Sequence, residues 1–121
     1  MAIQSNISSA PIPLVATASG DTTLVASVTT PSRQAVTAFS VFNTTANARA
    51  FDVYESPNTT SASGKKIASY IVPGNSSTDV VEMIGQGLST GQNVIGVQTT
   101  GGAALGDLNA KITTTQYTAG S

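Results

Sequence analysis

Short apolar runs with a two-residue period recur along the chain, separated by turn-forming residues. The clearest is residues 108–114, LNAKITT, where Leu108, Ala110 and Ile112 fall on one face and polar residues on the other. No segment keeps the 3.6-residue period of an amphipathic helix for more than two turns. Because such strands recur about every 8–12 residues, the pattern predicts an all-β fold.

The 121 residues fit one domain. We expect a single antiparallel β-sandwich, Ig-like or jelly-roll-like, over residues 21–121, preceded by an extended N-terminal arm over residues 1–20. Charged residues make up only 9% of the chain, far below the roughly 25% of a typical soluble domain. The surface is therefore expected to be neutral, polar and rich in hydroxyl groups.

Residues 35–43, AVTAFSVFN, are apolar on both faces of a strand. The alternation places Phe39 and Val41 on one face and three apolar residues on the other, namely Val36, Ala38 and Phe42. This pattern is typical of a central strand or of one covered by a partner.

The next strand is predicted at residues 51–55, with Phe51 and Val53 facing inward. The polar connection TTANAR has hairpin length, so the strands at residues 35–43 and 51–55 are predicted to pair. The remaining strand candidates are residues 22–29, 67–72, 78–83 and 92–100.

Three of these candidates carry further detail. The strand at 67–72 is stopped by Pro73-Gly74, a strong turn signal. Residues 78–83 fit either a strand or one helical turn with Val80, Val81 and Ile84 on one stripe, and the strand at 92–100 is predicted to turn Ile95 and Val97 inward.

The first fifteen residues combine prolines with bulky apolar side chains. Pro11 and Pro13 cannot lie inside a regular ladder, so this segment is expected to be extended. It is also too apolar for a free tail, and we expect it to dock on the edge of this domain or on a neighbouring subunit. The predicted interface residues here are Ile3, Ile7, Pro11, Ile12, Pro13, Leu14 and Val15.

The segment GQGLSTG, residues 85–91, could suggest a phosphate-binding loop. Its third glycine comes one residue too late for a dinucleotide fingerprint, and Gln92 stands where a P-loop needs lysine. The glycines are better explained as turn residues, with Leu88 anchored in the core.

Catalytic and metal-binding side chains are scarce. The chain has no histidine and no cysteine, so zinc sites of the usual kind, Ser-His-Asp triads and Cys-His pairs are excluded. A glycosidase needs two facing carboxylates, whereas Asp52 and Glu55 fall on opposite faces of their strand. We predict no enzymatic activity, no metal and no cofactor.

The charge balance also bears on partners. With a net charge of -1 the chain offers no basic field for nucleic acid. The N-terminus lacks the pattern of a secretory signal, and no run approaches the roughly 18 apolar residues of a membrane span. The protein is expected to stay soluble where it is made, without binding nucleic acid, a membrane or a small-molecule substrate.

Lys65-Lys66 is the only basic doublet and follows a loop rich in serine and threonine. It could contact an acidic neighbour, or it could be a solvated loop tip, and both interpretations stay open. Tyr54, Tyr70 and Tyr117 are too scattered to form a stacking platform and suit core edges or interfaces better.

Two stretches, AFSVFNTTANARAFDVYESP and GKKIASYIVPGNSSTDVVEMIGQGLSTGQNVIGV, together resemble small all-β virion proteins of tailed bacteriophages. In that group a strand ending in Asn-Thr precedes a strand of the F-x-V-Y type. An Ile-Ala-Ser-Tyr strand, a Pro-Gly-like turn and a glycine-rich segment with leucine then follow. The resemblance covers about two thirds of the chain, from near Val36 to Val97.

The resemblance implies a non-enzymatic structural protein of the virion, of the capsid decoration or cement type. Such a protein sits on the outer surface of the head in many copies, often as a homotrimer or another homo-oligomer. Its partners are the major capsid protein and copies of itself, and it is found in the host cytoplasm during assembly. The alternative is a binding module of the phage tail, neck or fibre that recognises a receptor or carbohydrate through polar loops such as residues 58–66.

Overall fold

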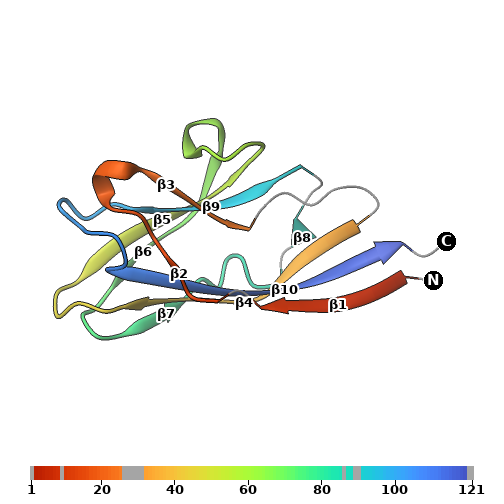
Figure 1. Cartoon of the computed structure of the whole chain (residues 1–121), viewed down its shortest axis with the longest axis horizontal. Helices are drawn as coiled ribbons and strands as arrows, with labels where there is room; N and C mark the ends of the chain where they lie inside the picture. Colours follow the sequence, from red (N-terminus) through yellow and green to blue (C-terminus); the bar gives the residue numbers. More distant parts are fainter. Residues whose placement is uncertain (1, 9, 26–31, 86, 89–90, 120–121) are drawn as a thin grey trace.

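The computed structural model describes residues 2–8, 10–25, 32–85, 87–88 and 91–119 (Figure 1). Strands dominate these residues, and two short 3₁₀ helices, η1 (Thr17–Ser19) and η2 (Ser61–Ser63), interrupt them. The strands are β1 (Ala2–Ser8), β2 (Ile12–Pro13), β3 (Asp21–Val25), β4 (Ser32–Asn43), β5 (Arg49–Ser56), β6 (Lys65–Val72), β7 (Ser77–Asp79), β8 (Gly87–Leu88), β9 (Asn93–Gln98) and β10 (Leu108–Ala119).

Two antiparallel sheets face each other. The first sheet, the lower one in Figure 1, runs in the order β1-β10-β4-β7, with β2 also pairing with β10 and β8 with β4. The second sheet runs β3-β9-β5-β6. In the first sheet Ala2 lies opposite Ala119, so the two ends of the described chain meet at one end of the molecule (Figure 1).

The connectivity is that of a jelly roll. β1 and β2 pair with successive parts of β10, and β7 and β8 with successive parts of β4, so each pair occupies one strand position. Numbering the positions along the chain then gives the orders 1-8-3-6 and 2-7-4-5. These are the two sheets of an eight-stranded jelly roll. The predicted all-β antiparallel sandwich is confirmed, and its connectivity is the jelly-roll alternative.

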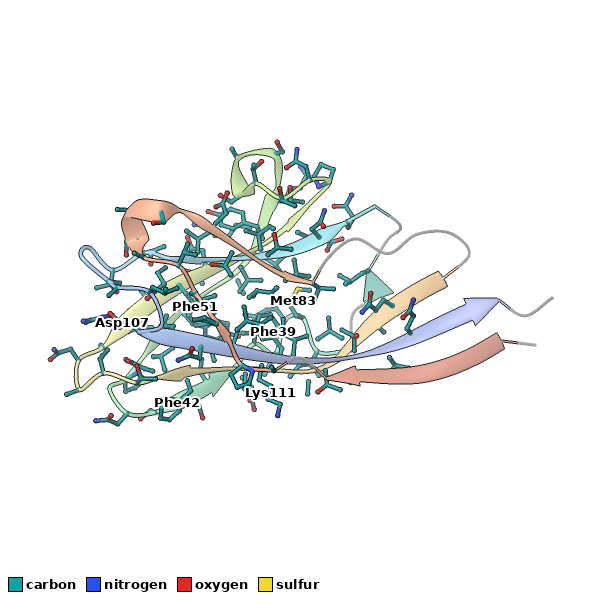
Figure 2. The ribbon with its side chains drawn as sticks, in the orientation of Figure 1. Phe39, Phe42, Phe51, Met83, Asp107 and Lys111 are labelled. Carbon is teal, nitrogen blue, oxygen red and sulfur yellow. The ribbon has the colours of Figure 1, made fainter. Side chains whose placement is uncertain are left out.

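The core fills the space between the sheets. Figure 2 shows Phe39 of β4, Phe51 of β5 and Met83 pointing into this space. Leu14, just after β2, is fully buried with them and belongs to the same cluster. Losing a buried phenylalanine of this kind typically costs about 3–5 kcal/mol, so these contacts dominate the stability of the sandwich.

The predicted pairing of residues 35–43 with residues 51–55 is wrong. β4 pairs with β10, β7 and β8, whereas β5 lies in the other sheet between β9 and β6. The six residues TTANAR do not close a hairpin: they carry the chain across the sandwich from one sheet to the other.

The predicted facing of β4 is correct for Phe39 and Val41 but not for Val36. Val36 is fully buried in the core, because the ladder with β10 shifts register between Thr113 and Thr114 and leaves Thr37 as an extra residue. This β-bulge turns Val36 to the inner face. Ala38 and Phe42 remain exposed on the outer face.

The predicted inward facing of Ile95 and Val97 is also wrong. A Cβ on Gly96 would meet the side chains of Leu14 and Leu24, so Gly96 faces the core and its two neighbours face outward. Ile95 is nevertheless fully buried. The loop of residues 57–64 leaves β5 and bonds Asp21 of β3 through the Ser61 amide and hydroxyl, so it passes over β9, which lies between those two strands.

The glycine-rich segment GQGLSTG turns the chain and anchors it, as predicted for the residues that are described. Gly85 and Gly91 both adopt positive φ, which favours glycine. Gly87 and Leu88 between them form β8, and Leu88 is buried in the core. Gln86, Ser89 and Thr90 lie outside the described residues, as do residues 26–29 of the strand predicted at 22–29. The alternatives for residues 78–83 resolve into a short strand, β7, followed by a turn that buries Val80 and Met83.

Asn43 organises the crossing after β4. Its fully buried side chain donates to the carbonyls of Asn47 and Val72, and its Oδ1 accepts from the amide and hydroxyl of Thr45. The Asn43 side chain thus closes a turn by bonding the backbone two residues further on. Gly74, in the β6–β7 loop, packs directly on this crossing, because a Cβ built there would lie 2.2 Å from the Ala46 carbonyl oxygen.

Replacing Gly74 by alanine is expected to lower the free energy of unfolding by about 3 kcal/mol, because backbone atoms would have to move apart to admit the methyl group. Chemical denaturation measures this loss. Gly101→Ala is the matched control, since its Cβ would meet nothing within 4 Å, and it should change stability little. Equal stabilities of the two variants would contradict the close approach.

A hydrogen-bonded network closes the end of the sandwich near η1. The Nε2 group of buried Gln98 donates to the carbonyls of Leu14, Val15 and Ala104. Asp107 accepts from the Ala104 amide and from Arg49. The Ala104 amide lowers the pKa of Asp107 most, partial burial opposes this shift, and the Arg49 guanidinium adds to it.

A lowered carboxyl pKa stabilises the fold above the ordinary value of about 3.9, and this contribution disappears as the pH falls through the folded-state pKa. Asp107→Asn is therefore expected to cost about 1 kcal/mol at pH 7 and progressively less below pH 4. Thermal unfolding of the wild type and of Asp107→Asn across this pH range measures the difference in their stability. Asp79→Asn, at an exposed carboxylate, serves as the control, and a gap for Asp107→Asn that stays constant down to pH 3 would refute the linkage.

Candidate interaction surfaces

Large apolar side chains are exposed at five described positions: Phe42, Ile71, Val81, Ile84 and Leu105. Three of them lie on β6 or on the turn that Tyr70 ties to β6. Ile71 belongs to β6 itself and is 73% exposed, while Val81 (64%) and Ile84 (36%) belong to the turn that follows β7. We call Ile71, Val81 and Ile84 the apolar flank.

Tyr70 fixes this turn against β6. Its hydroxyl donates to the Glu82 carboxylate and also forms a hydrogen bond with the Val81 backbone. Its ring stacks on Phe51, with centroids 5.7 Å apart. Tyr70 therefore ties the turn that carries Val81 and Ile84 to β6, while Ile71 projects from the opposite face of that strand.

The outer face of the first sheet carries a further exposed apolar side chain, that of Phe42. Phe42 is 46% exposed and points away from the interior, as does Lys111 (Figure 2). Its direct cross-strand neighbours are Asn109 of β10 and Ser77 of β7, and Pro13 of β2 lies beyond Asn109. A single aromatic ring surrounded by small and polar residues resembles the hot spot of a protein–protein interface.

The structure distributes the predicted interface residues of the arm over three environments. The backbones of Ile3 and Ile7 lie in β1, on the edge of this chain's own first sheet. Pro11 and Pro13 are exposed, and Ile12 and Val15 are partly buried. Leu14 is fully buried in the core, which makes its side chain part of this fold's interior. Any contact of the arm with another molecule stays a prediction.

Lys65 and Lys66 begin β6 and are both exposed. The Lys66 ammonium lies 3.2 Å from Asp52, whose other carboxylate oxygen accepts from Ser69. Glu55 lies directly opposite Lys65 in the ladder. The doublet therefore belongs to the strand, and Lys66 contributes to a pair within the chain.

A cleft opens beside this doublet. It has a volume of about 410 Å³ and is lined by Glu55, Pro57, Ser63, Lys65, Ile67 and Gln92. This size falls within the range of small-ligand sites, and the lining offers both hydrogen-bond donors and acceptors. Within the described residues no group of three metal-ligating side chains occurs, and no helix is long and apolar enough to cross a membrane.

Sequence reasoning missed the apolar flank. Ile71 was assigned to a strand without regard to its face, and Val81 and Ile84 were grouped with buried Val80. The available signal was the run IVPG at the end of β6: alternation from buried Ala68 and Val72 and partly buried Tyr70 leaves Ile71 on the outside.

No protein-family model and no curated protein matches the chain. Among solved structures, a chain from a structure of infectious bursal disease virus, Gx strain, matches with a TM-score of 0.46 and 14% identity, over 99% of this chain and 33% of that one. A chain from the Gt strain structure matches with a TM-score of 0.35 and 14% identity, over 98% and 32%. The present chain thus spans about a third of their length. Both TM-scores lie below 0.5, so the likeness carries no inference about function.

Partial burial, and then the bond to Glu82 and its charge, raise the pKa of Tyr70. Stability from a raised pKa is complete below the ordinary value of about 10 and is lost as the pH rises through the folded-state pKa. Tyr70→Phe is therefore expected to cost about 1 kcal/mol at pH 7 and less above pH 10. Chemical denaturation at pH 7 and at pH 10.5 measures the loss of stability at each pH, with Tyr54→Phe as the matched control. A loss that does not shrink at the higher pH would contradict this role.

Proposed function

We propose that this chain is a non-enzymatic structural protein of a virion, namely a decoration or cement protein on the outer head surface of a tailed bacteriophage. Its partners are the major capsid protein and further copies of itself. The observation that carries the proposal is the jelly-roll connectivity, combined with large exposed apolar side chains on an otherwise polar surface. Jelly rolls are recurrent in viral capsid domains, and exposed apolar patches mark protein–protein contacts.

The outer face of the first sheet is the surface we assign to the shell. It is long because β10 and β4 are both twelve residues long, and Phe42 lies near one end of it, directly opposite the uncharged Asn109 and Ser77. Burying this ring against a shell protein removes apolar area from water, and the ring's direct cross-strand neighbours carry no charge that would lose its hydration. The resemblance of residues 36–97 to small phage virion proteins supports the same assignment.

The alternative is a binding module of the tail, neck or fibre. One observation favours it, the cleft beside the loop of residues 57–64, where Glu55 and Lys65 face each other across a partly apolar floor. A receptor peptide or a carbohydrate could be held there by its polar groups.

Phe42→Lys is expected to weaken binding to shells assembled without this protein by at least tenfold, because a buried aromatic anchor typically contributes 2 kcal/mol or more (roughly 30-fold). Co-sedimentation of purified protein with such shells measures the affinity. Leu105→Lys makes the same change at an exposed position on the β9–β10 loop and should bind normally, with circular dichroism confirming that both variants fold.

Removing residues 1–8 deletes β1 and keeps the buried Leu14, and it tests the role of the arm in binding. Wild-type protein that does not co-sediment with shells, yet binds isolated tails or host-cell surfaces, would overturn the decoration assignment in favour of the alternative.

A further inference from the structure

The free edge of the second sheet has the properties of a pairing surface. β6 is eight residues long, contains no proline and pairs only with β5 among the described residues. Its other side therefore presents a row of backbone N–H and C=O groups, which is a template for another strand. By contrast, β7 and β8 on the neighbouring edge are three and two residues long and are separated by a turn.

The apolar flank borders this edge. Ile71 projects from the outer face of β6, while Val81 and Ile84 lie on the turn that Tyr70 ties to the same strand. A strand added to β6 would thus gain backbone hydrogen bonds and would cover exposed apolar side chains on both sides of the edge. Lysines, which disfavour the pairing of edge strands, occupy only the first two positions of β6.

We propose that two copies of this chain pair through antiparallel addition of β6 to β6, which joins their second sheets into one continuous sheet. The inference rests on the proposed function, in which the protein acts as a homo-oligomer, and it specifies a two-fold pair instead of a trimer. A second copy is the occupant because an isologous contact supplies an extended strand and a matching apolar flank at once.

Charge selects the antiparallel direction. A parallel arrangement would place the lysines of both copies against each other. The antiparallel arrangement leaves the two lysine pairs at opposite ends of the contact.

The register of the proposed β6–β6 pair follows from the face of the sheet on which each side chain lies. In an antiparallel ladder, directly opposed residues share a face, so the two-fold axis must pass through a residue. The bulge at Ile67 turns Lys66 to the outer face, so regular alternation of faces covers residues 68–72. An axis at Ser69 sets Ala68 of each copy opposite Tyr70 of the other. An axis at Tyr70 would bring Pro73, which has no N–H, into the ladder, and an axis at Ala68 would bring Lys66 onto Tyr70. Ser69 therefore lies opposite Ser69.

Disulfide trapping tests this register directly, because the chain has no cysteine of its own. Opposed Cα atoms in an antiparallel pair lie about 4.5–5.5 Å apart, within the range of about 4.4–6.8 Å that a disulfide accepts. Ser69→Cys is expected to form a covalent pair at least tenfold faster than Ser19→Cys, an exposed serine in η1, under the same mild oxidation. Equal rates for the two variants would overturn the proposal.

Light scattering of the cysteine-free protein gives a second readout. The wild type is expected to be a two-chain species, Ile71→Lys to raise the dissociation constant at least tenfold, and Leu105→Lys to leave it unchanged. A wild type that stays a single chain up to high micromolar concentration, or an Ile71→Lys variant that pairs normally, would refute the β6 contact. Shell binding is scored separately: a single chain that still binds shells sinks the pairing alone, whereas a paired chain that ignores shells sinks the proposed function alone.

Discussion

Contact between the inner faces of the two sheets is the interaction on which the rest of the molecule depends. Except between β5 and β6, each move to the next strand position carries the chain to the other sheet, so few strands can pair with their neighbour in sequence. Phe39 from one sheet and Phe51 from the other fill the space between them, and Leu14 joins them from the segment after β2. Because charge is scarce, this apolar contact must supply most of the stability.

The sequence predicts the class of this fold better than its strand connectivity. Alternation located the central strand at Phe39 and Val41 and the strand at Phe51 and Val53, since side-chain period is a local property. The connection TTANAR was misassigned because six residues can either close a hairpin or cross a sandwich, and local propensity does not choose between them. The choice is made by distant contacts, such as the bonds from Asn43 to Val72 and the packing of Gly74 on Ala46.

The candidate surfaces show the same limit of prediction from local sequence patterns. Ile95 looks like a core residue in the sequence, and it is buried, but on the outer face under a loop that Asp21 holds through Ser61. Ile71 looks equally internal and lies in the open. Whether an apolar side chain of a doubly apolar strand is covered depends on which loop folds over it, and only the three-dimensional structure shows that. The exposed positions that remain are the ones available for assembly.

In the proposed assembly, the contact with the shell and the contact between copies use two different surfaces. One is the outer face of the first sheet around Phe42. The other is the free edge of the second sheet beside Ile71. A protein that stabilises a shell needs both a contact with the shell and contacts between copies. The jelly roll provides a rigid frame on which the two can coexist without competing.

Electron cryo-microscopy of shells incubated with the purified chain tests the central claim most directly. The account predicts additional density on the outer head surface into which the sandwich fits with the Phe42 face against the shell. Bare shells, or density confined to the neck or tail of complete particles, would contradict it.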